Sequence, residues 1–290
     1  FDNNDRPGIL LSSAIEKYSN FFGVACGQKN VLFTNNDSAY ETAISLFQKG
    51  INVEAIIDNR EEVDSKLVKE IEKNNIKIYK GYTVVNTFGY KKINKISIMQ
   101  LSKDGQKVVG SKISIDCDCL GMSGGWTPAV HLFTQSGGKL KFRDEDQVFI
   151  PDTYPSDQIS IGSCNGEFTL DEILSSISKK LKDFLNIKKT EYENLEIQSH
   201  FNKTKRNIWL LPSDKIIGKT KPFVDYQNDA TAKDIKLALR EGFRSIEHVK
   251  RYTTTGMGTD QGKLGNMHAL GIISETAGSK MGELGTTTFR

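Results

Sequence analysis

Strands and helices alternate over residues 30–80, and this alternation constrains the fold more than any other feature of the sequence. The apolar run NVLFT is followed by a helical stretch that ends at Gly50. The same order repeats with VEAIIDN, a charged amphipathic helix and a third short strand, IKIYKG. Short connections between such units indicate parallel strands covered by helices. The sequence therefore predicts a doubly wound α/β layer.

Two runs of alternating apolar and polar residues follow, at 92–101 and 106–115. The dipeptide Asp104–Gly105 between them is a strong signal of a hairpin turn. A parallel βαβαβ unit capped by a hairpin is typical of the nucleotide-binding insert of flavoproteins that are similar to disulfide reductases.

The composition fits a soluble globular protein and argues against two classes of partner. Lys and Arg total 39 against 36 Asp and Glu, without the clustered positive charge of a nucleic-acid-binding surface. The longest apolar runs have the length of strands, so we expect no membrane-spanning segment. The N-terminal stretch lacks the basic start and apolar core of a signal peptide, and four scattered cysteines suit a reducing compartment. We therefore expect a cytoplasmic protein.

Few side chains have the spacing of a catalytic or metal site. Cys117 and Cys119 form a single C-x-C, which favours two thiols packed on one face of a strand over a metal site. His131 lies among apolar residues, without a nucleophile or acid at a triad-like offset. If the chain takes part in redox chemistry, the electrons must therefore belong to a cofactor.

The turn at residues 33–40 stands where a dinucleotide fold carries its G-x-G-x-x-G motif. Asn35, Asn36 and Asp37 replace the glycines there, and Asp58 ends the next strand, about where a ribose-binding acid belongs. Two interpretations stay open, a nucleotide site and a purely structural layer.

Two further loops have the character of anion-binding sites. Residues 161–170, IGSCNGEFTL, lead from a strand through a Gly-x-x-x-Gly turn into a helix, where backbone N–H groups favour an anion. Residues 251–266 contain four threonines, four glycines and two cations, which also suit an anion. Each loop has a purely structural alternative.

Four stretches of the sequence together resemble the α subunit of heterotetrameric sarcosine oxidase. They are NNDRPGILL (3–11), TNNDSAY (34–40), the run 122–140 that starts MSGGWTPAV, and the run 224–263 that starts VDYQNDATAKD. The resemblance implies a partial two-dinucleotide-binding fold of the FAD/NAD type, followed by a small helical domain related to bacterioferritin-associated ferredoxin. The expected divisions are a remnant of the first dinucleotide domain (1–28), a nucleotide-binding-like insert with hairpin (29–115), the return to the dinucleotide domain (116–188), a linker (189–222), the small helical domain (223–268) and a connector (269–290) toward an absent folate-binding domain.

The same resemblance implies the cofactors. Gly162, Gly166, Glu167 and Thr169 match the last fingerprint of the NAD site. The family also shares an FMN between its α and β subunits, and the implied contacts are Thr254, Thr255, Thr259, Gln261 and Lys263. FAD and tetrahydrofolate belong to the complex but not to this fragment.

The ferredoxin relation does not extend to an iron–sulfur cluster. The positions that match its four cysteine ligands are Asp225, Gln227, Asp260 and Gly265. None of them supplies a thiolate, which the cluster needs.

The function implied is part of the α subunit of a sarcosine oxidase complex with β, γ and δ subunits. The complex demethylates sarcosine to glycine with O2 and passes formaldehyde to folate, while this part supplies the NAD pocket and an FMN surface. We expect no catalytic residue here and no activity from the isolated chain. The alternatives are the α subunit of a related flavin-dependent amino-acid or opine dehydrogenase, and a truncated non-catalytic binding module.

Overall fold

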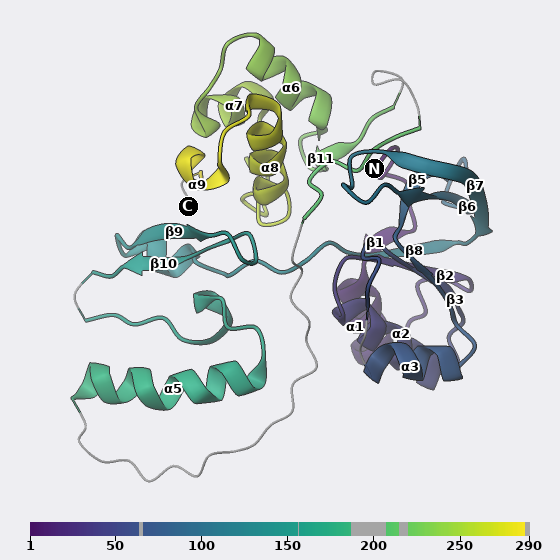
Figure 1. Cartoon of the computed structure of the whole chain (residues 1–290), viewed down its shortest axis with the longest axis horizontal. Helices are drawn as coiled ribbons and strands as arrows, with labels where there is room; N and C mark the ends of the chain where they lie inside the picture. The colour runs from purple at the N-terminus through teal and green to yellow at the C-terminus, as the bar shows by residue number, and fades with distance from the viewer. Residues whose placement is uncertain (64–65, 156, 187–206, 215–219, 288–290) are drawn as a thin grey trace.

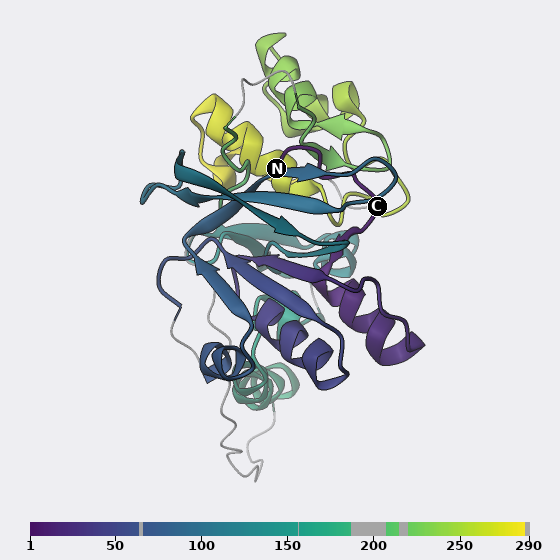
Figure 2. The same cartoon turned by 90° about the vertical axis from the view of Figure 1, so that its right-hand side faces the viewer.

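A five-stranded parallel sheet is the centre of the first half of the chain, in the order β1-β8-β2-β3-β4. The computed structural model describes residues 1–63, 66–155, 157–186, 207–214 and 220–287. Three helices cover one face of the sheet and an antiparallel sheet, β5-β6-β7, covers the other (Figures 1 and 2). The bounds are β1 Ile9–Leu11, α1 Ser12–Phe22, β2 Asn30–Thr34, α2 Ser38–Gln48, β3 Val53–Asp58, α3 Lys66–Lys73, β4 Lys77–Lys80, β5 Tyr82–Phe88, β6 Lys95–Leu101, β7 Val108–Asp116 and β8 Cys119–Ser123.

The alternation of side chains along β2 explains why both faces of the sheet are covered. Leu32 points into the core that faces the helices, whereas Val31 and Phe33 point into the core that faces β5–β7. Successive strand residues point to opposite faces, and both sets here are apolar. A parallel sheet of this kind is stable only when both faces are removed from water.

The structure confirms the α/β character of the fold and the predicted hairpin. Strands β6 and β7 pair as antiparallel neighbours, with Leu101 opposite Val108 on either side of the Asp104–Gly105 turn. It adds β5, which the sequence did not indicate as a strand. Residues 9–22, expected in the remnant of a separate domain, belong to the same layers: Leu10 of β1 pairs with Gly121 of β8, and α1 follows directly on β1.

The second half of the chain forms a hairpin and a helical unit with a shared core. Phe142 and Phe149 of the hairpin pack with Ile235 and Ile273 of the helices. Helix α5 lies apart from both in Figure 1, and none of its residues is buried. The bounds are α4 His131–Gln135, β9 Lys139–Arg143, β10 Val148–Thr153, the 3-10 turn η1 Gly162–Asn165, α5 Leu170–Leu185, β11 Phe223–Asp225, β12 Ala230–Thr231, α6 Ala232–Arg240, α7 Ile246–Thr253, α8 Asn266–Ala277 and α9 Met281–Leu284.

The expected extended connector at 269–290 is corrected by the structure, which places α8 and α9 there. The glycines that suggested a loop serve the helix instead. Gly278 ends α8 in the left-handed conformation, and Gly271 lies inside the helix, where a Cβ atom would overlap the indole of Trp209. Most of the predicted linker, at 189–206 and 215–219, lies outside the described residues.

Residues 1–4 connect the sheet domain to the helical unit. The side chain of Asn4 donates to the Phe223 carbonyl at 2.9 Å and accepts from the Phe223 N–H at 2.8 Å. These bonds hold β11 beside the sheet domain. In the described part of the chain, every helix is too short or too polar to cross a membrane.

We predict that Gly271→Ala destabilises the protein by about 1–3 kcal/mol, because the methyl group must displace Trp209 from a packed interface. Thermal unfolding and the fluorescence of Trp209, in a Trp126→Phe background, measure the effect. Gly124→Ala is the matched control, since a Cβ atom there meets nothing within 4 Å. Equal stability and emission in the two variants would contradict the packing described.

Candidate functional site

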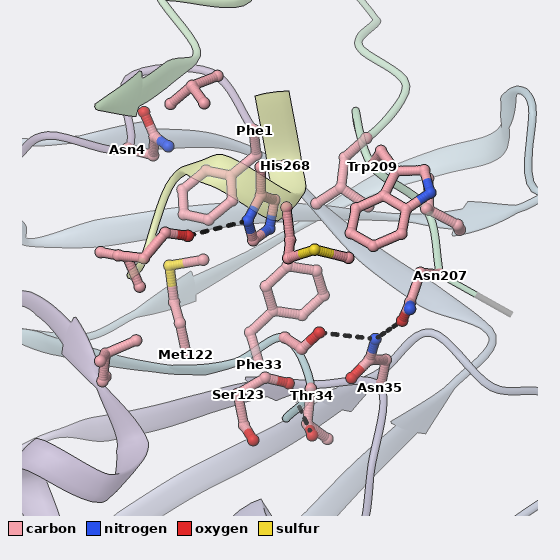
Figure 3. A pocket seen from close by; sticks show the side chains of 18 of the residues that line it. Phe1, Asn4, Phe33, Thr34, Asn35, Met122, Ser123, Asn207, Trp209 and His268 are labelled. Atoms are coloured by element: carbon pink, nitrogen blue, oxygen red, sulfur yellow. Dashed lines mark hydrogen bonds between the residues drawn. The ribbon is translucent and has the colours of Figure 1, made fainter. Parts of the chain in front are cut away.

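The carboxyl ends of β2 and β8 open onto a cavity of about 580 Å³. Its wall combines the turns after these two strands, the segment 207–211 and the first half of α8 (Figure 3). Open parallel sheets bind ligands beyond the carboxyl ends of their strands. The volume also falls within the range of roughly 300–1,000 Å³ that is typical of ligand pockets. This cavity, here called the large cavity, is the candidate functional site.

A seam of hydrogen bonds holds the floor of the large cavity together. The Asn35 side-chain amide donates to the Gly124 carbonyl and to the Asn207 side-chain oxygen, both at 3.1 Å (Figure 3). The Thr34 hydroxyl donates to the Ser123 carbonyl at 3.2 Å. These bonds fix the two strand ends relative to each other and to segment 207–211.

Aromatic and sulfur-containing side chains form the apolar part of the wall. Planar rings and thioethers of this kind are suited to stacking against a flat ligand ring. They include Phe1, Phe33, Met122, Phe168, Trp209 and Met267.

His268 of α8 contributes an imidazole ring to this wall. Its Nδ1 lies 3.3 Å from the Leu264 carbonyl oxygen, and Trp209 meets the ring edge-on at 5.9 Å between centroids. One side of the imidazole is exposed to the cavity, and protein atoms surround its other sides. This burial lowers the pKa of His268. The ring is therefore neutral at neutral pH, with one donor and one acceptor nitrogen. The sequence did not single out His268, because its helix was not expected.

At the outer side of the same strand ends, Arg60 links two buried carboxylates. Its guanidinium lies 2.8 Å from Asp37 and 2.7 Å from Asp58. The Tyr40 hydroxyl also donates to Asp58 at 2.9 Å. Burial, followed by the Asp58 charge, raises the pKa of Tyr40, so this donor keeps its proton. Asp58 is therefore held by the protein itself and is not free for a ribose.

The turn at 33–38 is likewise satisfied internally. The Asn36 side-chain oxygen accepts from the Ser38 N–H at 3.1 Å, at the N-terminus of α2. No glycine in this turn lets the backbone approach a pyrophosphate. Of the two interpretations of this turn, the geometry favours the structural layer, and the turn contributes the floor of the large cavity.

The residues predicted for NAD lie in η1 and at the start of α5. The Glu167 carboxylate accepts from the Gly162 N–H at 2.9 Å and pairs with Lys180 at 2.6 Å. Thr169 caps α5 by accepting from the Glu172 N–H, and Gly166 has the left-handed conformation that ends η1. Burial alone would raise the pKa of Glu167, but Lys180 and neighbouring hydrogen bonds hold it below its usual value. From this turn, Phe168 reaches the large cavity.

The residues predicted for FMN are spread over one loop, and Lys263 is the one among them that lines the large cavity. Thr255 is buried, with its hydroxyl 2.7 Å from that of Thr253. Thr254 and Gln261 have positive φ, and the Thr259 hydroxyl donates to the Gln227 side chain at 2.7 Å.

Two of the residues that the resemblance matched to cluster ligands, Asp225 and Gln227, anchor this loop. Asp225 is buried and accepts from the Gly256 N–H at 2.7 Å. Gln227 accepts from the Thr259 N–H at 2.6 Å. Hydrogen bonds from side chains therefore close the loop in which the sequence predicted an anion site.

The thiols of the C-x-C pair do not share a strand face. Cys117 packs in the core toward β5–β7, and Cys119 packs in the core toward the helices. Burial raises the pKa of each to about 12, so both stay protonated. Nowhere in the described ranges do three or more His, Cys, Asp or Glu side chains gather as metal ligands.

Comparisons with known proteins point to one family. The chain is 32% identical to the sarcosine oxidase alpha subunit of Corynebacterium sp. strain P-1 and 33% identical to that of Rhizobium meliloti strain 1021. Both alignments cover 100% of this chain, but only 30% and 28% of the two relatives. The family model described as the sarcosine oxidase A3 domain matches residues 219–290.

The fold is similar to that of L-proline dehydrogenase from P. horikoshii, with a TM-score of 0.62 and 19% identity. The match covers 100% of this chain and 53% of that chain. At this identity the similarity concerns the fold alone.

We predict that Arg60→Met destabilises the protein by about 3–5 kcal/mol, because it leaves Asp37 and Asp58 buried without their cation. Chemical denaturation measures the loss. The control is Lys92→Met, which removes an exposed partner of Asp118 and should cost about 1 kcal/mol or less. Similar losses in the two variants would show that the Arg60 links do not stabilise the sheet edge.

We predict that Glu167→Gln lowers stability at neutral pH by about 1–2 kcal/mol, since the pair with Lys180 is lost. The pKa of Glu167 is lower in the folded state than in the unfolded state. The ionised carboxylate therefore adds to the free energy of unfolding at pH values above the unfolded-state pKa, and this stabilisation is lost as the pH falls through the folded-state pKa. Stability curves of the two proteins against pH should therefore converge in acid. A constant difference down to the acid limit would contradict this role.

Proposed function

Because the chain belongs to the sarcosine oxidase alpha-subunit family, we propose that it forms part of the α subunit of a complex that oxidises sarcosine to glycine with O2. The chain spans about 30% of the length of its curated relatives, so the reaction is a property of the larger assembly. In this proposal, the chain supplies cofactor-binding surface and no catalytic residue.

The observation that carries the proposal is the position of the large cavity at the carboxyl ends of β2 and β8. The wall has the chemistry that a nucleotide cofactor needs. Trp209 and Phe33 supply aromatic surface for a flat base, and Lys263 supplies the cation that a phosphate requires. The residues present therefore fit a nucleotide, and we propose NAD, which supplies hydride-transfer chemistry when bound.

The turn after β2 does not fit the pyrophosphate, since its polar groups are already bonded to each other. The phosphates then belong on the α8 side of the large cavity, near Lys263. Gly162, Gly166, Glu167 and Thr169 have a supporting role here, because the Gly162–Glu167 bond and the Thr169 cap of α5 lie on either side of Phe168, which lines the large cavity.

The loop that ends at Lys263 is also our proposed contact for the FMN shared with a β subunit. Thr254, Thr255, Thr259 and Gln261 give that loop its shape, through hydrogen bonds and positive φ angles. The proposed small-domain ancestry is a bacterioferritin-associated ferredoxin that has lost its cluster, and the Asp225 and Gln227 anchors support it. FAD, tetrahydrofolate and the γ and δ subunits belong to other parts of the complex.

We predict that co-expression of the chain with a family β subunit yields a complex that contains FAD, FMN and NAD. The cofactors are released by denaturation and measured by chromatography. A stable complex without NAD would contradict the proposed pocket, and a chain that purifies alone and colourless would contradict the proposed subunit role.

A cavity-filling variant locates the NAD within that complex. Ala14→Trp inserts an indole into the large cavity from α1 and should reduce the bound NAD by about tenfold or more. Ser13→Trp is the matched control, since Ser13 is exposed on the same helix and does not line the cavity. Equal NAD content in the two variants would place the cofactor elsewhere.

A further inference from the structure

A second, smaller cavity lies next to the large one. It has a volume of about 190 Å³ and lies between the segment 127–131, the first turns of α8 and the residues Thr286 and Thr287. Thr127, Lys263 and Met267 line both cavities and therefore form the partition between them.

The titratable side chains that line the small cavity are both basic residues. Lys263 and His131 line it, and no Asp or Glu does. Every carboxylate that the structure describes lies beyond ion-pairing distance of the Lys263 ammonium. Burial and then the nearby charge of Lys263 lower the pKa of His131, so Lys263 carries the positive charge of this wall. The potential in the small cavity is therefore positive.

The remaining wall of the small cavity is mostly apolar. It includes Pro128, Ala129, Val130, Phe149, Ile246 and Leu270. An uncompensated positive charge beside apolar groups attracts an anion more strongly than it would in water. A phosphate dianion would need more donors than this wall presents, because each unpaired charge is costly away from water.

We propose that the small cavity binds a small organic monocarboxylate with a short apolar body, whose carboxylate group pairs with Lys263. The volume equals about six water molecules in the liquid, which suits an acid of three to five carbons. The side chain of Asn266 is already bonded to the Gln261 carbonyl and to Thr287, so it shapes the wall rather than recruiting the ligand. The site shares Lys263 with the NAD and FMN contacts proposed above, but its test uses neither cofactor.

Isobutyrate, isobutyramide and inorganic phosphate test the proposal on the purified 290-residue chain at constant ionic strength. Isobutyramide has the shape of isobutyrate without its charge. Isothermal titration calorimetry should show millimolar binding of isobutyrate, and binding of the amide and of phosphate should be about tenfold weaker or less. Equal binding of the amide, stronger binding of phosphate, or no binding of isobutyrate would each overturn the proposal.

Three variants locate the bound acid. Lys263→Met removes the charge and keeps the stem, and Ala129→Phe fills the small cavity alone. Each should weaken isobutyrate binding by about tenfold or more. Ala14→Trp fills the large cavity alone and should leave the binding unchanged. Binding that survives Lys263→Met or Ala129→Phe, or that disappears in Ala14→Trp, would overturn the proposal.

The folding of each variant is verified by thermal unfolding. Lys263 is exposed, so its replacement leaves the cores unchanged. If Ala129→Phe does not fold, the proposal is still tested by the affinities of isobutyrate and isobutyramide, each measured for the wild-type chain and for Lys263→Met.

Discussion

The burial of both faces of the parallel sheet determines where this chain can hold a ligand. Val31 and Phe33 of β2 need cover from β5–β7, and Leu32 needs cover from the helices. With both faces closed, the functional surface is restricted to the ends of the strands. The helical unit, tied to the sheet domain through Asn4, lies over the carboxyl ends and turns that edge into an enclosed space.

Many polar groups that resemble ligand contacts in the sequence are satisfied by the protein. Asp58 is held by Arg60 and Tyr40, Glu167 by Lys180, and the loop threonines by their neighbours. Buried polar groups need such partners, because an unpaired one lowers the free energy of unfolding by a large fraction of its small total. Lys263 differs from them, since its ammonium faces two cavities and forms no ion pair with a described carboxylate. In this chain, a charged side chain without an ion-pair partner is therefore a better indication of a ligand contact than a residue that matches a sequence motif.

Patterns of short range predicted the layers of the fold, and the resemblance of long motifs predicted the family. The alternation over residues 30–80 and the Asp104–Gly105 turn are local signals, and the structure retains both. The sequence predicts no helix at α8, because glycine disfavours helices, although Gly271 is required there by contact with Trp209. The large cavity could not be predicted from spacing, since its wall joins Asn35 to Asn207 across 172 positions of the sequence. Such a wall depends on tertiary packing, which no local pattern encodes.

The closure of the loop at 254–263 has a consequence for how the helical unit is made. The Asp225 carboxylate accepts a hydrogen bond from the Gly256 N–H, and the Gln227 side-chain oxygen accepts one from the Thr259 N–H. A loop closed in this way is held by side chains of the same polypeptide. The shape of this loop is therefore determined by the chain itself as it folds.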